Sequence, residues 1–394
     1  MRSLAVGNMY PPHHLGGYEL VWQSAVRHLR ELGHQVRVVT TDFALSQPAE
    51  PEDDDVHREL RWWWHAHEFP RRTMSERVAI ERHNAHVLER HLDELRPHVV
   101  TWWSMGGMSL SLIERVRQRG IPAVAFVHDD WLVYGPRVDA WLATPPLVRA
   151  PAAAALRIPA RVDFGRAARY VFVSETTRRH SLVRHRLPDT GVAHSGIDPA
   201  FVDPRPLQEW RWRLLYVGRI DERKGIATAV AALAQLPEQA TLTIVGEDNP
   251  DAERELRTQA GALGVANRIR LEGFRRRSEL PAAYEATDVV VFPVVWEEPW
   301  GLVPLEAMAL ARPVVATGRG GSGEYLRDGD NALLFEAGDP AALAAAVRRL
   351  ADDPGLRARL RDGGLRTAPK HTEDAFNASV ARELEAACPA TVPA

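Results

Sequence analysis

The sequence predicts an α/β protein built from two doubly wound, Rossmann-like domains. Short apolar, β-branched segments, typical of buried parallel strands, alternate along the chain with segments of helical periodicity. In each half, a strand is followed by a glycine-containing loop and then a helix, at Gly16-Gly17 and at Gly218, as in doubly wound nucleotide-binding units. A length of 394 residues also suggests two domains of ordinary size rather than one core.

Composition excludes several classes of protein. Hydrophobic residues at 45% and charged residues at 26% are globular values. A net charge of −3 gives no overall field that would attract nucleic acid or an anionic membrane. The only cysteine is Cys388, so an internal disulfide is excluded and a reducing compartment is indicated. Because we find neither a signal peptide nor an apolar run of about 20 residues, we expect a soluble, cytoplasmic protein.

The first half begins with a predicted strand at residues 3–6. A helix with apolar residues at helical spacing follows from Gly17 to Leu32, Gly33 ends it, and residues 36–40 form the next strand. Residues 46–60 contain two prolines and a run of acids, so we expect an exposed loop there.

Three consecutive tryptophans, Trp62, Trp63 and Trp64, follow this loop. Stacked indoles can hold the apolar face of a sugar or an aglycone. An aromatic strand packed into the core is the arrangement that we expect.

Several histidines in the same region raise the question of a metal site: His65, His67, His83, His86 and His91. The cysteines and carboxylates that usually complete such a site are not at ligand spacing. We therefore expect solvated histidines and no metal.

His128 ends a buried strand at residues 123–127, which follows a long helix at 77–95 and a strand at 99–102. Ligands of open α/β sheets bind outside the carboxyl ends of the strands, so His128 is positioned for function. The alternative is a histidine that only bonds a neighbouring loop.

A further strand at residues 170–173 leads into a helix capped by Ser174. The arginines that follow are Arg178, Arg179, Arg184 and Arg186. A solvated face is the expected arrangement, and a patch for an anionic acceptor or a membrane surface is the alternative.

The second half starts after a proline-containing linker near residues 203–210. Its first strand, 213–217, is followed by Arg219 and Lys224, and then by an alanine-rich helix that ends at Leu236. After a strand and at a helix start, a forked guanidinium and a compact ammonium can hold one diphosphate together. Lys224 is one of only two lysines, with Lys370, among 49 Lys and Arg residues, which favours a specific role.

After strands at residues 242–246, 269–274 and 288–293, the chain contains two carboxylates eight positions apart, Glu298 and Glu306. Glu298 lies in the predicted loop, and the next helix begins near Leu302. Free N–H groups at a helix start, such as those of Leu302 and Val303, attract a diphosphate, and Gly301 lets a ligand approach the backbone. Ionised carboxylates accept hydrogen bonds from hydroxyl groups.

The stretch from Trp296 to Ala309 resembles the E-x7-E motif of the retaining GT-B glycosyltransferases, family 4-like, the group that includes glycogen synthase and bacterial mannosyltransferases. Further motifs match, listed here with their residues: the Gly-Arg…Lys-Gly signature (Gly218, Arg219, Lys224, Gly225), the paired glycines (Gly16, Gly17), the strand-end histidine (His128) and a Gly-Gly-x-x-Glu turn (Gly320, Gly321, Glu324). The chain departs from the usual residues of the family at Ser195, Gly323, Ala311 and Ala332. Because Arg275 also departs from the family pattern, the resemblance does not determine which nucleobase the donor carries.

The resemblance implies a GT-B fold, with two Rossmann-like domains facing each other across a cleft. The acceptor domain is expected at residues 1–203, with a C-terminal crossover helix at about 373–388. The nucleotide-sugar donor domain is expected at residues 204–372.

The resemblance also implies transfer of a sugar from a nucleotide diphosphate sugar to an acceptor hydroxyl, with retained configuration. The favoured donor nucleotide is UDP, then GDP; the acceptor is a small molecule, a glycan or a lipid-linked sugar. The expected catalytic residues are His128, Glu298, Arg219 and Lys224. The expected donor-binding residues are Gly16, Gly17, Arg219, Lys224, Gly273, Phe274, Glu298, Gly301, Leu302, Val303 and Glu306. No cofactor or metal is expected, because the cations replace it. The alternatives are a GT-B sugar-nucleotide epimerase and a non-catalytic sugar-nucleotide-binding protein.

Overall fold

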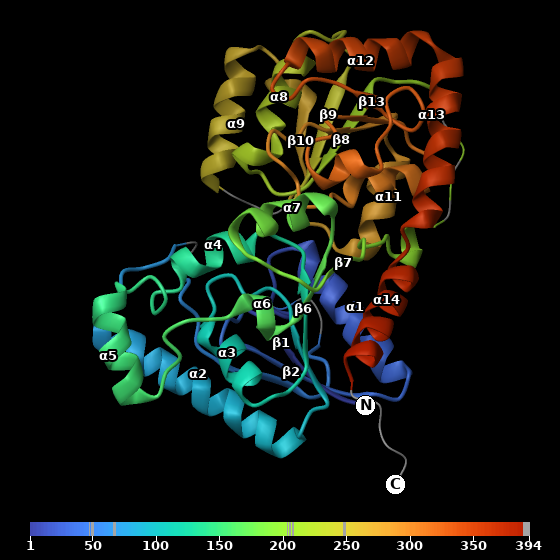
Figure 1. Ribbon diagram of the computed structural model, residues 1–394. Helices are drawn as coiled ribbons and strands as arrows, with labels where there is room; N and C mark the ends of the chain where they lie inside the picture. Colours follow the sequence, from blue (N-terminus) through green and yellow to red (C-terminus); the bar gives the residue numbers. More distant parts are fainter. Residues whose placement is uncertain are drawn as a thin grey trace. The chain divides into compact units, whose positions relative to one another are not determined.

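The computed structural model describes residues 1–46, 48, 51–65, 68–202, 204, 206, 209–246 and 250–388. The chain divides into two compact units. Unit 1 contains Met1–His194 and the residues from Asp374 on, and unit 2 contains Ser195–Glu373. Each unit has its own parallel sheet flanked by helices (Figure 1). In the part of the chain that is described, no helix is long and apolar enough to cross a membrane.

The sheet of unit 1 has the strand order β3-β2-β1-β4-β5-β6-β7, and every pairing in it is parallel. The strands are β1 (Arg2–Val6), β2 (Gln35–Thr41), β3 (Val56–Leu60), β4 (Val99–Trp102), β5 (Ala123–Val127), β6 (Arg169–Phe172) and β7 (Thr190–Val192). Because all strands run the same way, the loops after them gather at one edge of the sheet.

Helices cover both faces of this sheet. They are α1 (Gly17–Glu31), α2 (Met74–Leu95), α3 (Ser111–Gln118), α4 (Trp131–Val138), α5 (Pro146–Leu156), α6 (Phe164–Ala167), α7 (Glu175–Arg184) and α14 (Glu373–Ala387). α1 and α14 lie side by side (Figure 1), and Asn377 of α14 donates a hydrogen bond to Ser24 of α1 at 2.8 Å. α14 is thus an integral part of unit 1, although unit 2 precedes it in the sequence.

Unit 2 has a six-stranded parallel sheet in the order β10-β9-β8-β11-β12-β13. The strands are β8 (Arg213–Val217), β9 (Thr241–Val245), β10 (Ile269–Leu271), β11 (Val289–Phe292), β12 (Val314–Ala316) and β13 (Leu333–Leu334). The helices are α8 (Ile226–Leu233), α9 (Pro250–Ala262), α10 (Leu280–Glu285), α11 (Val303–Ala309), α12 (Pro340–Asp352) and α13 (Pro354–Thr367). The strand order reverses at β8, so right-handed crossovers place α8 and α9 on one face of the sheet and α11 on the other (Figure 1).

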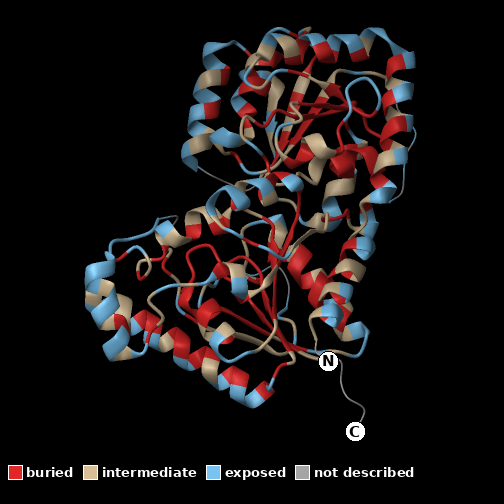
Figure 2. Ribbon diagram, in the orientation of Figure 1, coloured by how far each residue is buried: buried red, intermediate tan, exposed pale blue. Residues whose placement is uncertain are grey.

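Each unit is organised around its buried strands, while the outer helix faces are exposed (Figure 2). All residues of β4, β5, β11 and β12 are buried. These are the apolar runs that the sequence identifies as strands, and a strand covered on both faces requires such a run.

The expectation of a continuous loop at residues 46–60 is wrong at its end, because Val56–Leu60 forms β3 at the edge of the sheet. The centre of this strand is polar, His57-Arg58-Glu59, so the strand lacks the apolar run by which buried strands are recognised. Those side chains form ion pairs instead, such as Arg58 with Glu52 at 2.5 Å. Gln47, Ala49 and Glu50 of the expected loop lie outside the described residues.

The sequence places the domain boundary at 203/204, whereas the structure divides the chain at 194/195. Residues just after this point bond to the end of unit 2: Ile197 donates its N–H to the His371 carbonyl at 2.9 Å, and accepts at its own carbonyl from the Glu373 N–H at 3.0 Å. This two-sided bonding explains why Ser195 onwards groups with unit 2. Four residues of the expected linker, 203, 205, 207 and 208, lie outside the described residues.

Candidate active site

The carboxyl edge of the unit 2 sheet brings Lys224 and Glu298 together. Lys224 ends a single 3-10 turn, Glu222–Lys224, after β8, and Glu298 lies in the loop after β11. The Lys224 ammonium donates to the two carboxylate oxygens of Glu298 at 2.9 and 2.7 Å. The sequence positions of these residues are 74 apart, and their pairing depends on β8 and β11 being adjacent in the sheet.

Backbone geometry fixes this lysine. Gly225, which follows it, has φ +69°, and a Cβ at this position would overlap the carbonyl oxygen of Pro293. The two loops are also joined directly, because the N–H of Val295 donates to the carbonyl of Arg223 at 2.9 Å. Gly225 is therefore required by both its conformation and the close approach of the β11 loop.

Glu298 is held on several sides. Its exposed fraction is only 9%, and the Trp296 indole N–H donates to Oε2 at 2.8 Å. Its backbone carbonyl accepts from the N–H of Gly321 at 2.7 Å, and Gly320 forms a bridge with it. Gly320 has φ +69°, and a side chain there would overlap the Glu298 backbone. The Gly-Gly turn thus supports the carboxylate loop.

Two arginines, Arg219 and Arg223, lie in the same loop as Lys224 and keep guanidinium groups accessible. The side chain of Arg219 is 50% exposed, and its nearest acidic partner is Asp221 at 3.9 Å. The Arg223 guanidinium lies 4.8 Å from the centre of the Trp296 ring and pairs with Asp221 at 2.8 Å. These contacts lower the pKa of Asp221 to about 2, with the Arg223 hydrogen bonds as the main cause. The edge is therefore rich in positive charge that is exposed to a ligand.

Glu306, the second carboxylate of the motif, lies in α11. It is buried, and Tyr284 of α10 donates its hydroxyl proton to Oε2 at 2.6 Å. Burial raises the pKa of Glu306, and the nearby Arg277 guanidinium and the Tyr284 hydrogen bond act in the opposite direction. Arg277 is itself anchored by Asp198 at 3.2 Å.

The start of α11 is close to its predicted position, with Leu302 as N-cap residue and Val303 as the first helical residue. Both are partly buried. Gly301, just before them, has φ +85°, and a Cβ there would meet the Phe292 ring at 2.9 Å. Gly301 is therefore a structural requirement of the turn, whatever ligand lies nearby.

Gly273 and Phe274 follow β10 at the same edge. Gly273 has φ +64° and accepts a hydrogen bond from the N–H of Gly246 at 3.0 Å. The Phe274 side chain is 63% exposed. Arg275 pairs with Glu272 at 2.5 Å. An exposed aromatic ring beside a backbone turn is suited to stacking on a planar base.

His128 directly follows β5 and belongs to unit 1, whereas the residues described above belong to unit 2. It is buried, and its ring centre lies 4.5 Å from that of Tyr18 and 5.3 Å from that of Phe376. Burial lowers the pKa of His128 to about 3. The ring is therefore neutral at physiological pH, and it can exchange hydrogen bonds with a sugar without carrying charge.

Gly16 is the N-cap residue of α1 in unit 1, and Gly17 is the first residue of this helix. Gly16 is extended, with φ −146°, and a Cβ on Gly17 would meet no atom within 4 Å. The backbone conformation thus requires glycine at neither position. Both residues are exposed, so their small size leaves the backbone open to a ligand.

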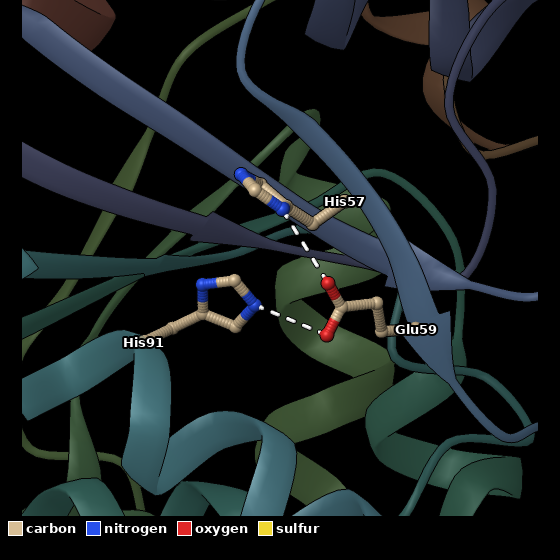
Figure 3. A group of neighbouring side chains, drawn as sticks. All are labelled: His57, Glu59 and His91. Carbon is tan, nitrogen blue, oxygen red and sulfur yellow. Dashed lines mark ion pairs between the residues drawn. The ribbon is translucent and has the colours of Figure 1, made fainter. Parts of the chain in front are cut away.

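The expectation of solvated histidines is wrong for His91, which is 1% exposed. Figure 3 shows it with His57 and Glu59: His57 Nδ1 lies 3.5 Å from Oε1 of Glu59, and His91 Nε2 lies 3.5 Å from Oε2. Ligand atoms of the three residues lie within 4.8 Å of one another. Arg90 pairs with the same Glu59 oxygen, and Arg37 lies 3.3 Å from His91 Nδ1.

A cation in this cluster would therefore meet two guanidinium groups, which already supply positive charge. Burial is the main cause that lowers the pKa of His91 to about 4, and positive neighbours add to it. We interpret the cluster as an ion-pair network that holds β3 on α2. His65 and His86 are exposed as expected, His83 is partly buried, and His67 lies outside the described residues.

The arginines in and just after α7 are mostly solvated, as expected. Arg179, Arg184 and Arg186 are exposed, and Arg178 pairs with Glu175 at 3.0 Å.

Sequence reasoning missed three side chains of this site. Trp296 lies in the E-x7-E stretch, but nothing in its sequence position indicates its contact with Glu298, and Tyr284 and Arg277 come from a segment that carries no motif. Only the folded chain shows that they contact or face the two glutamates.

Two protein-family models match the chain. The model of Glycosyltransferase Family 4 matches residues 15–201, and the model of glycosyl transferases group 1 matches residues 201–366. Between them the two models extend from residue 15 to residue 366.

Curated relatives match a smaller part. A glycogen synthase of Mycobacterium tuberculosis is 38% identical over 179 residues, which are 44% of this chain and 42% of the relative. A D-inositol 3-phosphate glycosyltransferase of Xylanimonas cellulosilytica is 38% identical over 152 residues, 38% of this chain and 36% of the relative. The alignments thus span less than half the length of these relatives.

Solved structures match almost the whole chain. The sucrose-phosphate synthase of Thermosynechococcus elongatus has a TM-score of 0.75 at 21% identity and covers 98% of this chain and 99% of its own. The Anabaena protein HepE, in complex with UDP and glucose, has a TM-score of 0.72 at 21% identity, covering 98% and 100%. At this identity the likeness establishes the fold. The predicted GT-B fold is confirmed, and the chain belongs to the family 4-like GT-B glycosyltransferases.

Proposed function

We propose that this glycosyltransferase moves a sugar from a nucleotide diphosphate sugar to an acceptor hydroxyl, with retention of the anomeric configuration. The observation that carries the proposal is the Lys224–Glu298 pair at the carboxyl edge of the unit 2 sheet, beside the half-exposed Arg219. It places an ammonium, a guanidinium and a carboxylate where a doubly wound sheet binds its ligand.

The cations match the charge that forms during the reaction. When the bond between the anomeric carbon and the diphosphate breaks, the electron pair moves to the diphosphate. Lys224 has three N–H donors, of which Glu298 engages two, and Arg219 presents a forked donor set. Preorganised donors at a developing negative charge contribute strongly to catalysis. In this proposal they take the place of a metal, and no cofactor is required.

In this proposal the carboxylates of Glu298 and Glu306 accept hydrogen bonds from hydroxyl groups of the donor. Glu306 would accept from the ribose, Glu298 would orient the transferred sugar, and neutral His128 would hydrogen-bond to it. The diphosphate and the base would lie along Gly301, Leu302 and Val303 and along Gly273 and Phe274. Gly16 and Gly17 would leave room for the donor in unit 1.

Retention follows most simply from front-face transfer. Glu298 is a poor candidate for a nucleophile, because Lys224 and Trp296 already donate to its oxygens. The leaving diphosphate then accepts the proton of the acceptor hydroxyl on the face where the new bond to the anomeric carbon forms. An α-configured donor gives an α-linked product.

UDP is the first donor nucleotide to test, since HepE has been crystallised with UDP-glucose, and GDP is the second. A small molecule, a glycan or a lipid-linked sugar is the acceptor class. A cytoplasmic location and peripheral membrane contact through the arginines of α7 remain predictions.

The deciding experiment combines release of nucleoside diphosphate with NMR of the product. The proposal requires UDP or GDP release together with an α-linked product. Interconversion of sugar nucleotides without an acceptor product would indicate an epimerase, and donor binding without turnover would indicate a non-catalytic binding protein. Either result would overturn the proposal.

A further inference from the structure

We propose that Phe43, Trp62 and Trp64 of unit 1 form an aromatic platform that binds the apolar ring face of a neutral sugar acceptor. This inference rests on the proposed function, because it assigns the second substrate of the same transfer. The three rings are in mutual contact. The Trp62 and Trp64 ring centres lie 4.7 Å apart at 30°, and Phe43 meets them at 5.9 and 6.0 Å, edge to face.

The platform lies at the ligand-binding edge of the unit 1 sheet. Phe43 comes two residues after β2, and Trp62 and Trp64 follow β3. Ligands of parallel α/β sheets bind outside the carboxyl ends of the strands. In unit 2 this edge is occupied by the charged residues proposed to hold the donor, so the corresponding edge of unit 1 is the natural place for the other substrate.

The tryptophans are not simply a core strand, which corrects the expectation from the sequence. Only Trp63 is fully buried, where it packs with Ile80 and Trp141. Trp62 and Trp64 are only partly buried, on either side of it. Trp62 also packs against the main core of unit 1, so Trp62 and Trp64 each present only part of the indole to solvent.

The platform is held rigidly. The Trp62 indole N–H donates to the Gly106 carbonyl at 3.0 Å, and the Trp63 N–H donates to the Gly107 carbonyl at 3.0 Å. Buried Asn84 donates to the Arg61 carbonyl at 2.8 Å and accepts from the Arg61 N–H at 2.7 Å. A site that is fixed before its ligand arrives loses less entropy on binding.

The chemistry of the surface favours a neutral sugar. Aromatic rings present a negative face to the slightly positive C–H bonds of a pyranose. None of the three side chains carries a charge that would select a phosphorylated acceptor.

The test labels the protein with 5-fluorotryptophan and follows 19F NMR while a panel of neutral sugars, methyl α-glucopyranoside, maltose and cellobiose, is titrated in. Single Trp62→Phe and Trp64→Phe variants assign the two signals. We expect saturable shifts of these signals with at least one sugar, and about tenfold weaker binding in Phe43→Ala and Trp64→Ala, with partial recovery in Trp64→Phe. Trp210→Ala, which alters a partly buried indole pair of unit 2, is the matched control and should bind the sugar normally.

No shift with any neutral sugar would overturn the inference, as would shifts that appear only with glucose 6-phosphate or that persist in Phe43→Ala and Trp64→Ala. Melting temperature with UDP-glucose is recorded in parallel. If UDP-glucose does not raise the melting temperature, the proposed function is contradicted. The NMR titration tests sugar binding at the aromatic platform independently of that result.

Discussion

At the scale of single residues, the site depends on a buried ion pair whose partners come from different loops. Lys224 and Glu298 have side chains only 19% and 11% exposed. Removing one partner of such a pair leaves the other charge buried without compensation. The two residues therefore differ from the many surface ion pairs of this arginine-rich chain, each of which contributes little.

Lys224→Ala should lower turnover by about 10²–10³, the scale expected for the loss of one donor at a developing negative charge. Lys370→Ala is the matched control, because Lys370 is the only other lysine and is exposed. Steady-state kinetics of nucleoside diphosphate release give the comparison. Turnover near the wild-type value in Lys224→Ala would show that the diphosphate binds elsewhere.

Glu298→Gln should slow transfer and weaken sugar binding while the product stays α-linked, because the carboxylate orients the sugar and does not attack it. NMR of the product and mass spectrometry of the intact protein provide the measurements. A β-linked product, or a glycosyl group attached covalently at position 298, would refute front-face transfer.

The buried His128 predicts a pH-dependent contribution to stability. Its folded pKa of about 3 lies below the unfolded value near 6.5, so between these values the unfolded chain binds more protons and stability falls as the pH falls. The neighbouring Asp129, whose pKa burial raises to about 6, acts in the opposite direction. Urea unfolding of the wild type and of His128→Phe, compared from pH 7 to pH 4, isolates the histidine. The stability of the variant relative to wild type should rise toward acid, and a constant difference would contradict the assignment.

At the scale of elements, the sequence was most informative where a strand is buried on both faces. β5 and β11 are uniform apolar runs and were predicted almost to the residue. β3 was missed because it is held by backbone pairing with β2 and by side-chain contacts with other elements, and such partners are invisible in a local pattern. The same limit applies to the prediction of the site residues. Lys224, Glu298 and Glu306 lie in motifs that can be recognised in the sequence. Tyr284 and Arg277 do not, and only the fold brings them close to Glu306.

Gly225 offers a test of how the loops of the site are packed. Gly225 and Gly264 have φ values of +69° and +72°, but only a Cβ on Gly225 would overlap another backbone, while one on Gly264 meets open space. Gly264→Ala should therefore cost about 1–2 kcal/mol, the strain of a left-handed residue, and Gly225→Ala clearly more. Denaturant unfolding compares the two, and equal losses would argue against the close approach of the β11 loop.

At the scale of the whole molecule, the proposed chemistry uses protein cations instead of a metal. Dialysis against EDTA should therefore leave both turnover and melting temperature unchanged. Loss of turnover in EDTA that returns with a divalent cation would disprove the metal-independent route.

A nucleotide-sugar donor at 100 times its Kd should raise the free energy of unfolding by about 2.7 kcal/mol. Thermal shift with UDP-glucose and with GDP-mannose provides the measurement.

Because α14 packs on unit 1, the order in which the two units can fold during synthesis on the ribosome is affected. Glu383 of α14 pairs with Arg169, and Asn377 of the same helix bonds to Ser24, so unit 1 lacks one of its helices until residues beyond 373 have been synthesised. Unit 2, continuous from Ser195 to Glu373, is complete earlier. The part of the chain that is translated first is thus the last to obtain all of its contacts, and a nascent chain stalled before α14 would expose the surface of α1 that this helix covers.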